Sequence, residues 1–218
     1  MEKEYILSEV EKTGIVGVLR MDDITLFNEV VNALIDGGVN VIEITLTTPH
    51  ALDLLHTFSE KKYENVYLGA GTVLNVQDAK KVVQAGAQFI VSPILDLEII
   101  KFANENNVMV CPGAYSPSEI YRAWESGADV VKVFPATSLG PKFFKDIRGP
   151  MPFLKLTPTG GVSIENAGDF IKAGAAFLGA GTAMLNKKMI KEHDWKALSS
   201  LAQQFKTEVD RARREMMK

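Results

Sequence analysis

Short apolar runs alternate with longer amphipathic stretches along the whole chain. The apolar runs are rich in Val, Ile and Phe, as buried strands are, whereas the amphipathic stretches open on a capping residue and close near a glycine, as helices do. The pair recurs roughly every 25 residues, which is typical of repeated βα units. The expected strands are Ile15–Leu19, Val41–Thr45, Tyr67–Ala70, Phe89–Ser92, Val108–Cys111, Val130–Val133, Phe153–Thr157 and Phe177–Gly179.

Eight such units predict an α/β protein whose fold is a (β/α)8 TIM barrel, formed by a single domain over residues 1–218. We expect a short helix before the first strand, at about residues 2–12, and a long polar helix at about residues 188–218. A doubly wound open sheet is the alternative, but no G-x-G-x-x-G opens the first helix. In a barrel, catalytic groups stand at the carboxyl ends of the strands.

Composition narrows the possible partners. With 46% hydrophobic and 23% charged residues, the chain has ample material for a core. A net charge of −3 argues against nucleic acid or an anionic membrane as the main partner. The chain has no apolar run of membrane-spanning length, its first residues are charged, and its single Cys111 excludes an internal disulfide. We therefore expect a cytoplasmic protein.

Lys132 interrupts an apolar run, residues 130–135, that otherwise indicates a buried strand. Burial penalises an ammonium and favours the neutral amine. A neutral lysine amine is the nucleophile that forms Schiff bases with carbonyl substrates. The alternative is a lysine at a strand end that reaches water or pairs with a carboxylate.

Glu43 has the same place in its unit as Lys132. Each stands five residues after a glycine that ends a helical stretch, Gly38 and Gly127 respectively. If the units are equivalent, the two side chains project from one sheet in the same direction and at the same height. We therefore expect a carboxylate and an amine to converge on one site.

Glycine-rich segments follow the last two expected strands. They contain Gly160 and Gly161 after the seventh strand, and Gly181 with Thr182 after the eighth. Barrels commonly bind phosphate in these two loops, where glycine lets backbone N–H groups approach the anion. Tight βα turns also favour glycine, but two such loops on the two expected strands predict a phosphate site.

Other residues at strand ends have two interpretations each. Thr72 suits a small carboxylate, or caps the next helix. Arg20 suits a carboxylate or phosphate, or neutralises Glu43. Pro93 and Phe134 form an apolar pocket wall, or are plain packing.

The histidines point to no metal site. His50, His56 and His193 lie on helical segments without the spacing of metal ligands, so we expect surface roles for them.

These motifs resemble the 2-keto-3-deoxy-6-phosphogluconate and 2-keto-4-hydroxyglutarate aldolases, which are class I pyruvate-lyases. The similar segments are residues 37–45, 69–73, 91–93, 132–136 and 158–161. The resemblance implies a homotrimer of (β/α)8 barrels that needs no metal or cofactor and takes a small keto-acid sugar phosphate. It implies that Lys132 forms the Schiff base, that Glu43 is the general acid/base and that Thr72 helps to hold the pyruvate carboxylate.

The resemblance also assigns the phosphate to Gly160, Gly161 and the loop with Gly181 and Thr182. One position departs from the pattern: Thr47 stands where some members carry an arginine that contacts the pyruvate carboxylate. We expect Arg20 to compensate.

The substrate and even the reaction class stay open at this point. The gluconate-derived and galactonate-derived phosphorylated keto acids differ at one carbon, and 4-hydroxy-2-oxoglutarate is a third candidate. A phosphosugar isomerase or epimerase on the same barrel is an alternative enzyme, and a barrel that only senses a phosphosugar is a more distant one.

Overall fold

The structure, a computed structural model, describes residues 2–61 and 63–217. Its strands are short and lie near the expected positions. They are β1 Ile15–Leu19, β2 Val41–Thr45, β3 Tyr67–Gly71, β4 Phe89–Val91, β5 Met109–Cys111, β6 Gly113–Ala114, β7 Val131–Val133, β8 Leu156–Pro158 and β9 Leu178–Ala180.

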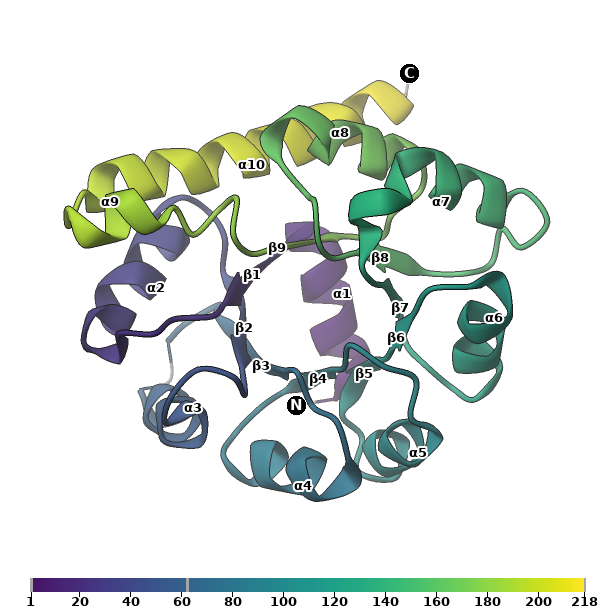
Figure 1. The fold of residues 1–218 in the computed structure, drawn as a ribbon, viewed down its shortest axis with the longest axis horizontal. Helices are drawn as coiled ribbons and strands as arrows, with labels where there is room; N and C mark the ends of the chain where they lie inside the picture. Colours follow the sequence, from purple (N-terminus) through teal and green to yellow (C-terminus); the bar gives the residue numbers. More distant parts are fainter. Residues whose placement is uncertain (1, 62, 218) are drawn as a thin grey trace.

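Helices separate most of the strands and lie outside them (Figure 1). The α-helices are α1 Lys3–Thr13, α2 Phe27–Asp36, α3 Ala51–Glu60, α4 Val76–Gln84, α5 Leu97–Glu105, α6 Pro117–Glu125, α7 Gly140–Arg148, α8 Ile164–Lys172, α9 Lys187–Lys191 and α10 Trp195–Met216. Two 3₁₀ turns, η1 Ile24–Leu26 and η2 Ala136–Ser138, lie in the loops after β1 and β7.

The strands form two parallel sheets that curl around a common centre (Figure 1). One sheet has the order β5-β4-β3-β2-β1-β9 and the other the order β6-β7-β8. Because the last strand, β9, pairs directly with the first, the sheet wraps around instead of reversing its order at a switch point. The fold is therefore α/β and TIM-barrel-like, and the doubly wound alternative is wrong.

In the part of the chain that the structure describes, the strands are not joined by one continuous ladder into an eight-stranded ring. Pro112 separates β5 from β6 because proline has no N–H to donate to a ladder. At the other junction β8 and β9 share no assigned ladder, and isolated bridges join Leu156 to Ala175 and Thr159 to Gly179.

Two apolar cores hold the fold together. The larger core lies between the strands and the outer helices, whereas the smaller one fills the space inside the strands. Ile6 and Val10 of α1 belong to the inner core, and Figure 1 shows α1 lying behind the ring of strands. This helix therefore closes one end of the interior.

The strand predicted at Phe153–Thr157 is displaced along the chain, since β8 is Leu156–Pro158. Phe153 is 53% exposed and its ring packs against Trp124 of α6, with 6.3 Å between ring centroids. The aromatic side chain therefore covers a neighbouring helix and does not enter a strand.

The predicted long terminal helix is two helices. His193, with φ of 55°, leaves the helical region between α9 and α10, and the Asp194 side chain accepts a hydrogen bond from Ala197 N at 2.9 Å. An Asp that caps a new helix explains the break. Lys218, the last residue of the predicted helix, lies outside the described residues.

Candidate active site

Lys132 and Glu43 lie inside the curled sheets. Lys132 is the middle residue of β7 and Glu43 the middle residue of β2, and they are only 5% and 3% exposed. Both side chains line one small internal cavity, together with Phe89, Cys111 and Thr157. The shared spacing from a glycine thus corresponds to a shared position in the structure.

The Glu43 carboxylate lies against the end of β3. Gly71 is paired in register with Thr45, and a Cβ atom on Gly71 would come within 1.8 Å of Glu43 Oε1. Glycine is therefore the residue that leaves room for the carboxylate.

Burial raises the pKa of the Glu43 carboxyl above its ordinary value, because desolvation penalises the charged form. The cationic groups of Lys132 and Arg20 oppose this shift in pKa. A buried carboxyl that binds its proton more tightly than usual is suited to exchange protons with a substrate near neutral pH.

Cys111 is the third titratable side chain in the cavity. Burial raises the pKa of its thiol well above the usual range. The thiolate is the reactive form of cysteine, so this side chain is chemically inert and contributes packing.

In the part of the chain that the structure describes, no hydrogen bond or ion pair joins the three carboxylate-binding candidates to one another. Arg20 follows β1, is exposed, and acts on Glu43 through charge alone. Thr72, half-buried with a left-handed φ of 60°, follows β3 directly. Strained backbone of this kind concentrates at functional sites. Thr47 is exposed, and its Oγ1 lies 3.0 Å from Oγ1 of Thr45.

Thr45 is a polar residue of this site that the sequence interpretation missed. It is 1% exposed, and its Oγ1 also lies 3.4 Å from that of Thr48, which in turn donates to the Leu19 carbonyl at 3.4 Å. Thr45 stands two residues after Glu43 and therefore on the same face of the strand, and this spacing could have predicted that it is buried beside Glu43.

Thr157 was missed in the same way. It is paired in register with Lys132, and its Oγ1 donates to the Phe177 carbonyl at 2.8 Å. The hydroxyl therefore joins β8 to the start of β9, where ladder hydrogen bonds are few.

The two predicted phosphate loops follow neighbouring strands, β8 and β9. Gly160 and Gly161 have left-handed φ values of 89° and 72°, which favour glycine. The loop is held by Asn166, whose Nδ2 donates to Gly161 O at 2.8 Å and whose Oδ1 accepts from Ser163 N at 2.9 Å. Asn166 belongs to the capping box of α8, so its side chain connects the start of this helix to the glycines.

The loop with Gly181 and Thr182 is held by backbone hydrogen bonds from the residues that follow it. The Gly181 carbonyl accepts from Met184 N at 2.9 Å and from Leu185 N at 2.8 Å, which stabilises the turn after β9. Thr182 is exposed.

The two predicted wall residues have different neighbours. The Lys132 Nζ atom lies 5.1 Å from the centroid of the Phe134 ring, within cation–π range. Pro93 is half-buried, and its carbonyl packs so closely on Gly113 that a Cβ there would lie 2.4 Å from its oxygen.

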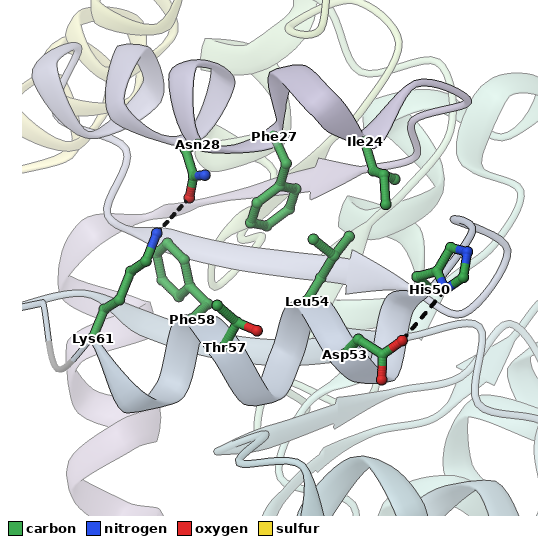
Figure 2. A pocket seen from close by; sticks show the side chains of 9 residues that line it. All are labelled: Ile24, Phe27, Asn28, His50, Asp53, Leu54, Thr57, Phe58 and Lys61. Atoms are coloured by element: carbon green, nitrogen blue, oxygen red, sulfur yellow. Dashed lines mark hydrogen bonds and ion pairs between the residues drawn. The ribbon is translucent and has the colours of Figure 1, made fainter.

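A larger groove, of about 350 Å³, lies elsewhere, between α2 and α3 (Figure 2). Figure 2 shows Phe27 and Phe58 facing each other at its base. Its charged groups are paired: Lys61 Nζ donates to Asn28 Oδ1 at 2.7 Å, and the exposed His50 lies 3.3 Å from Asp53.

Among its described lining residues the outer groove has no buried titratable group, whereas the inner cavity has Lys132, Glu43 and Cys111. His56 likewise pairs with Glu60 at the surface, and His193 is exposed, so the histidines have the predicted surface positions. The described residues contain no cluster of three or more His, Cys, Asp or Glu side chains that could hold a metal. None of the described helices has both the length and the apolar character needed to cross a bilayer.

Comparisons with known proteins identify relatives of the chain. The family model described as "KDPG and KHG aldolase" matches residues 6–201. The chain is 37% identical over 174 residues to the 2-dehydro-3-deoxy-phosphogluconate aldolase of Pseudomonas aeruginosa, covering 79% of each protein. It is 33% identical over 153 residues to the 2-dehydro-3-deoxy-6-phosphogalactonate aldolase of Escherichia coli K12, covering 70% of this chain and 75% of that one.

A solved structure is similar over nearly the whole chain. It is the KDPG aldolase of Legionella pneumophila with pyruvate captured as a covalent carbinolamine, with a TM-score of 0.83 and 28% identity, covering 90% of this chain and 96% of that one. The family match, the relatives and the shared fold lead to one conclusion: this chain belongs to the KDPG and KHG aldolase family of carbon–carbon lyases.

Proposed function

We propose that this protein is a class I aldolase that reversibly cleaves 2-keto-3-deoxy-6-phosphogluconate to pyruvate and glyceraldehyde 3-phosphate. The observation that carries the proposal is the convergence of Lys132 and Glu43, 5% and 3% exposed, on one internal cavity. A buried amine beside a buried carboxyl is the pair that imine chemistry requires. The names of the relatives supply the substrate class.

The reaction begins with Lys132. Its amine attacks the C2 ketone of the substrate to give a carbinolamine, and loss of water leaves a protonated imine. The imine is an electron sink, which is the purpose of covalent catalysis here.

Glu43 then moves the protons. It takes the proton of the C4 hydroxyl, directly or through a water, and the C3–C4 electron pair flows into the imine. The aldehyde leaves and an enamine remains. Glu43 returns a proton to C3, and hydrolysis of the imine releases pyruvate. One carboxyl serves both steps because it alternates between base and acid, and its raised pKa suits that exchange.

The strand-end residues hold the two ends of the substrate. Thr72, Thr47 and Arg20 bind the pyruvate carboxylate, whereas Gly160 and Gly161 bind the phosphate together with Gly181 and Thr182. Binding the remote phosphate orients the C3–C4 bond for cleavage. Phe134 and Pro93 wall the pocket and limit the entry of water.

We also propose that the two sheets close into one eight-stranded barrel. At one junction the Lys132 amide donates to the Pro112 carbonyl at 2.9 Å, which continues the pairing past the proline. At the other, Ala176 N donates to Leu156 O at 2.8 Å beside the isolated bridges. In this arrangement β5 and β6 together form the fifth strand.

The proposed assembly is a homotrimer in the cytoplasm. Leu74 and Ile94, 46% and 45% exposed, follow the neighbouring strands β3 and β4, and exposed apolar side chains on adjacent loops suit a contact between copies. Light scattering coupled to gel filtration tests this point, since the mass of three chains is expected. The free, buried Cys111 is consistent with a reducing compartment.

The function is tested by assaying pyruvate release from three substrates: the gluconate-derived and galactonate-derived phosphorylated keto acids, and 4-hydroxy-2-oxoglutarate. We expect the gluconate-derived substrate to have the highest kcat/KM. Lys132→Ala should abolish release, whereas Lys196→Ala, which changes an exposed lysine of α10, should not. Turnover of none of the three by folded protein would refute the proposal.

A further inference from the structure

Tyr115 contacts the loop that follows β7, the strand that carries Lys132. It directly follows β6, in which Ala114 is paired with Val133 of β7. Its hydroxyl lies 3.2 Å from Oγ of Ser138, the last residue of η2 in the loop after β7. The ring therefore reaches from the end of β6 over the end of β7.

The position of Tyr115 is fixed by the helix that follows it. Its backbone N donates to Glu119 Oε2 at 3.0 Å, and the same oxygen accepts from Ser116 N at 2.8 Å within the capping box of α6. The side chain is nevertheless 44% exposed. A hydrogen bond between two exposed hydroxyls exchanges for bonds to water and stabilises the fold little. Stability alone therefore does not account for this pair.

The loop that carries Ser138 also contacts the proposed phosphate loop. A Cβ on Gly161 would lie 2.8 Å from Thr137 Cα, and one on Gly160 would lie 3.3 Å from Thr137 Oγ1. Thr137, the chain neighbour of Ser138, thus connects the loop that Tyr115 contacts to the glycines. A substrate bound at Lys132 and at the glycines would extend its middle carbons toward this pair.

We propose that Tyr115 determines specificity for the aldehyde portion of the substrate, an inference that rests on the proposed aldolase function. Its phenol, supported by Ser138, hydrogen-bonds the hydroxyl on the carbon next to the phosphate-bearing carbon. That hydroxyl takes no part in bond cleavage, so Tyr115 recognises the substrate without contacting the reacting atoms. An acceptor aldehyde without the hydroxyl loses this bond.

The test compares two acceptors in the condensation with pyruvate: glyceraldehyde 3-phosphate and 3-oxopropyl phosphate, which lacks the middle hydroxyl. The ratio of their kcat/KM values is measured for the parent protein and for Tyr115→Phe. We expect the preference for the hydroxylated acceptor to fall by about three- to tenfold in the variant, the range set by one hydrogen bond between neutral groups. Tyr121→Phe is the matched control, because Tyr121 is also 44% exposed but lies on α6.

Exchange of the pyruvate methyl protons provides the second measurement. It needs only the amine and the carboxyl, so Tyr115→Phe should exchange at the parental rate, which a variant with a disturbed fold would not. An unchanged acceptor ratio in Tyr115→Phe, with the parent active, would overturn this inference alone. A parent protein that neither condenses nor exchanges would overturn the proposed function itself.

Discussion

Gly71→Ala tests whether the position of the Glu43 carboxylate governs proton transfer. The added Cβ would lie 1.8 Å from Oε1, whereas ordinary contacts begin near 3.4 Å. Restoring an ordinary contact therefore requires the carboxylate to move by about 3.4 minus 1.8, or 1.6 Å. Gly71 lies in a strand without a left-handed φ, so the alanine itself fits the backbone.

A displacement of this size is large for a catalytic group. A misplacement on the order of 1 Å can cost about 100-fold in rate. We therefore expect exchange of the pyruvate methyl protons for deuterium, followed by NMR, to slow about 100-fold in Gly71→Ala. Imine formation by Lys132 should persist, because that step does not require the carboxylate at its original position.

Gly17→Ala is the control for adding a methyl group to a buried strand. The nearest atom to its Cβ would be Leu34 Cδ1 at 3.2 Å, on the side of the outer helices. This variant should retain exchange. If Gly71→Ala is folded and exchanges at the parental rate, the placement of Glu43 as the proton-transfer group is wrong.

Three further variants test other parts of the account. Glu43→Gln should remove a pH dependence of stability. Because the pKa of Glu43 is raised in the folded protein, the folded carboxyl keeps its proton while the unfolded one loses it, so the parent's free energy of unfolding falls as pH rises above 4.5 and that of the variant does not. Parallel curves of this free energy against pH, measured by urea titration, would contradict the prediction. Gly161→Ala places a methyl group against Thr137 at a residue with a left-handed φ. This variant should raise KM for the phosphorylated substrate without changing the exchange rate of the pyruvate methyl protons. An unchanged KM would exclude the loop from phosphate binding. Thr157→Val should lower the free energy of unfolding by about 0.5–1.5 kcal/mol, because it loses the hydrogen bond to Phe177 O. If thermal and urea unfolding give the variant the same stability as the parent, this bond contributes nothing.

Much of the architecture could be predicted because repeated βα units place equivalent residues at equivalent heights. The spacing from Gly38 and Gly127 to Glu43 and Lys132 is such a case, and both side chains line one cavity. Spacing within a unit is a local property, so the sequence reveals it directly.

Features that depend on contacts between distant segments could not be predicted. Phe153 suggested a strand because it is apolar, but it packs on Trp124 from another unit. The Tyr115–Ser138 contact joins loops 23 residues apart, and no periodicity marks it. Thr45 is intermediate: its alternation with Glu43 is local, whereas its burial depends on the neighbouring strands.

The central claim is that Lys132 forms a Schiff base with pyruvate inside the barrel-like interior. The most direct measurement is incubation with pyruvate and borohydride, followed by mass spectrometry of the peptides. The account predicts one reduced pyruvyl adduct, on Lys132, that is absent from Lys132→Ala. Folded protein that gains no adduct, or gains it on another lysine, would contradict the claim.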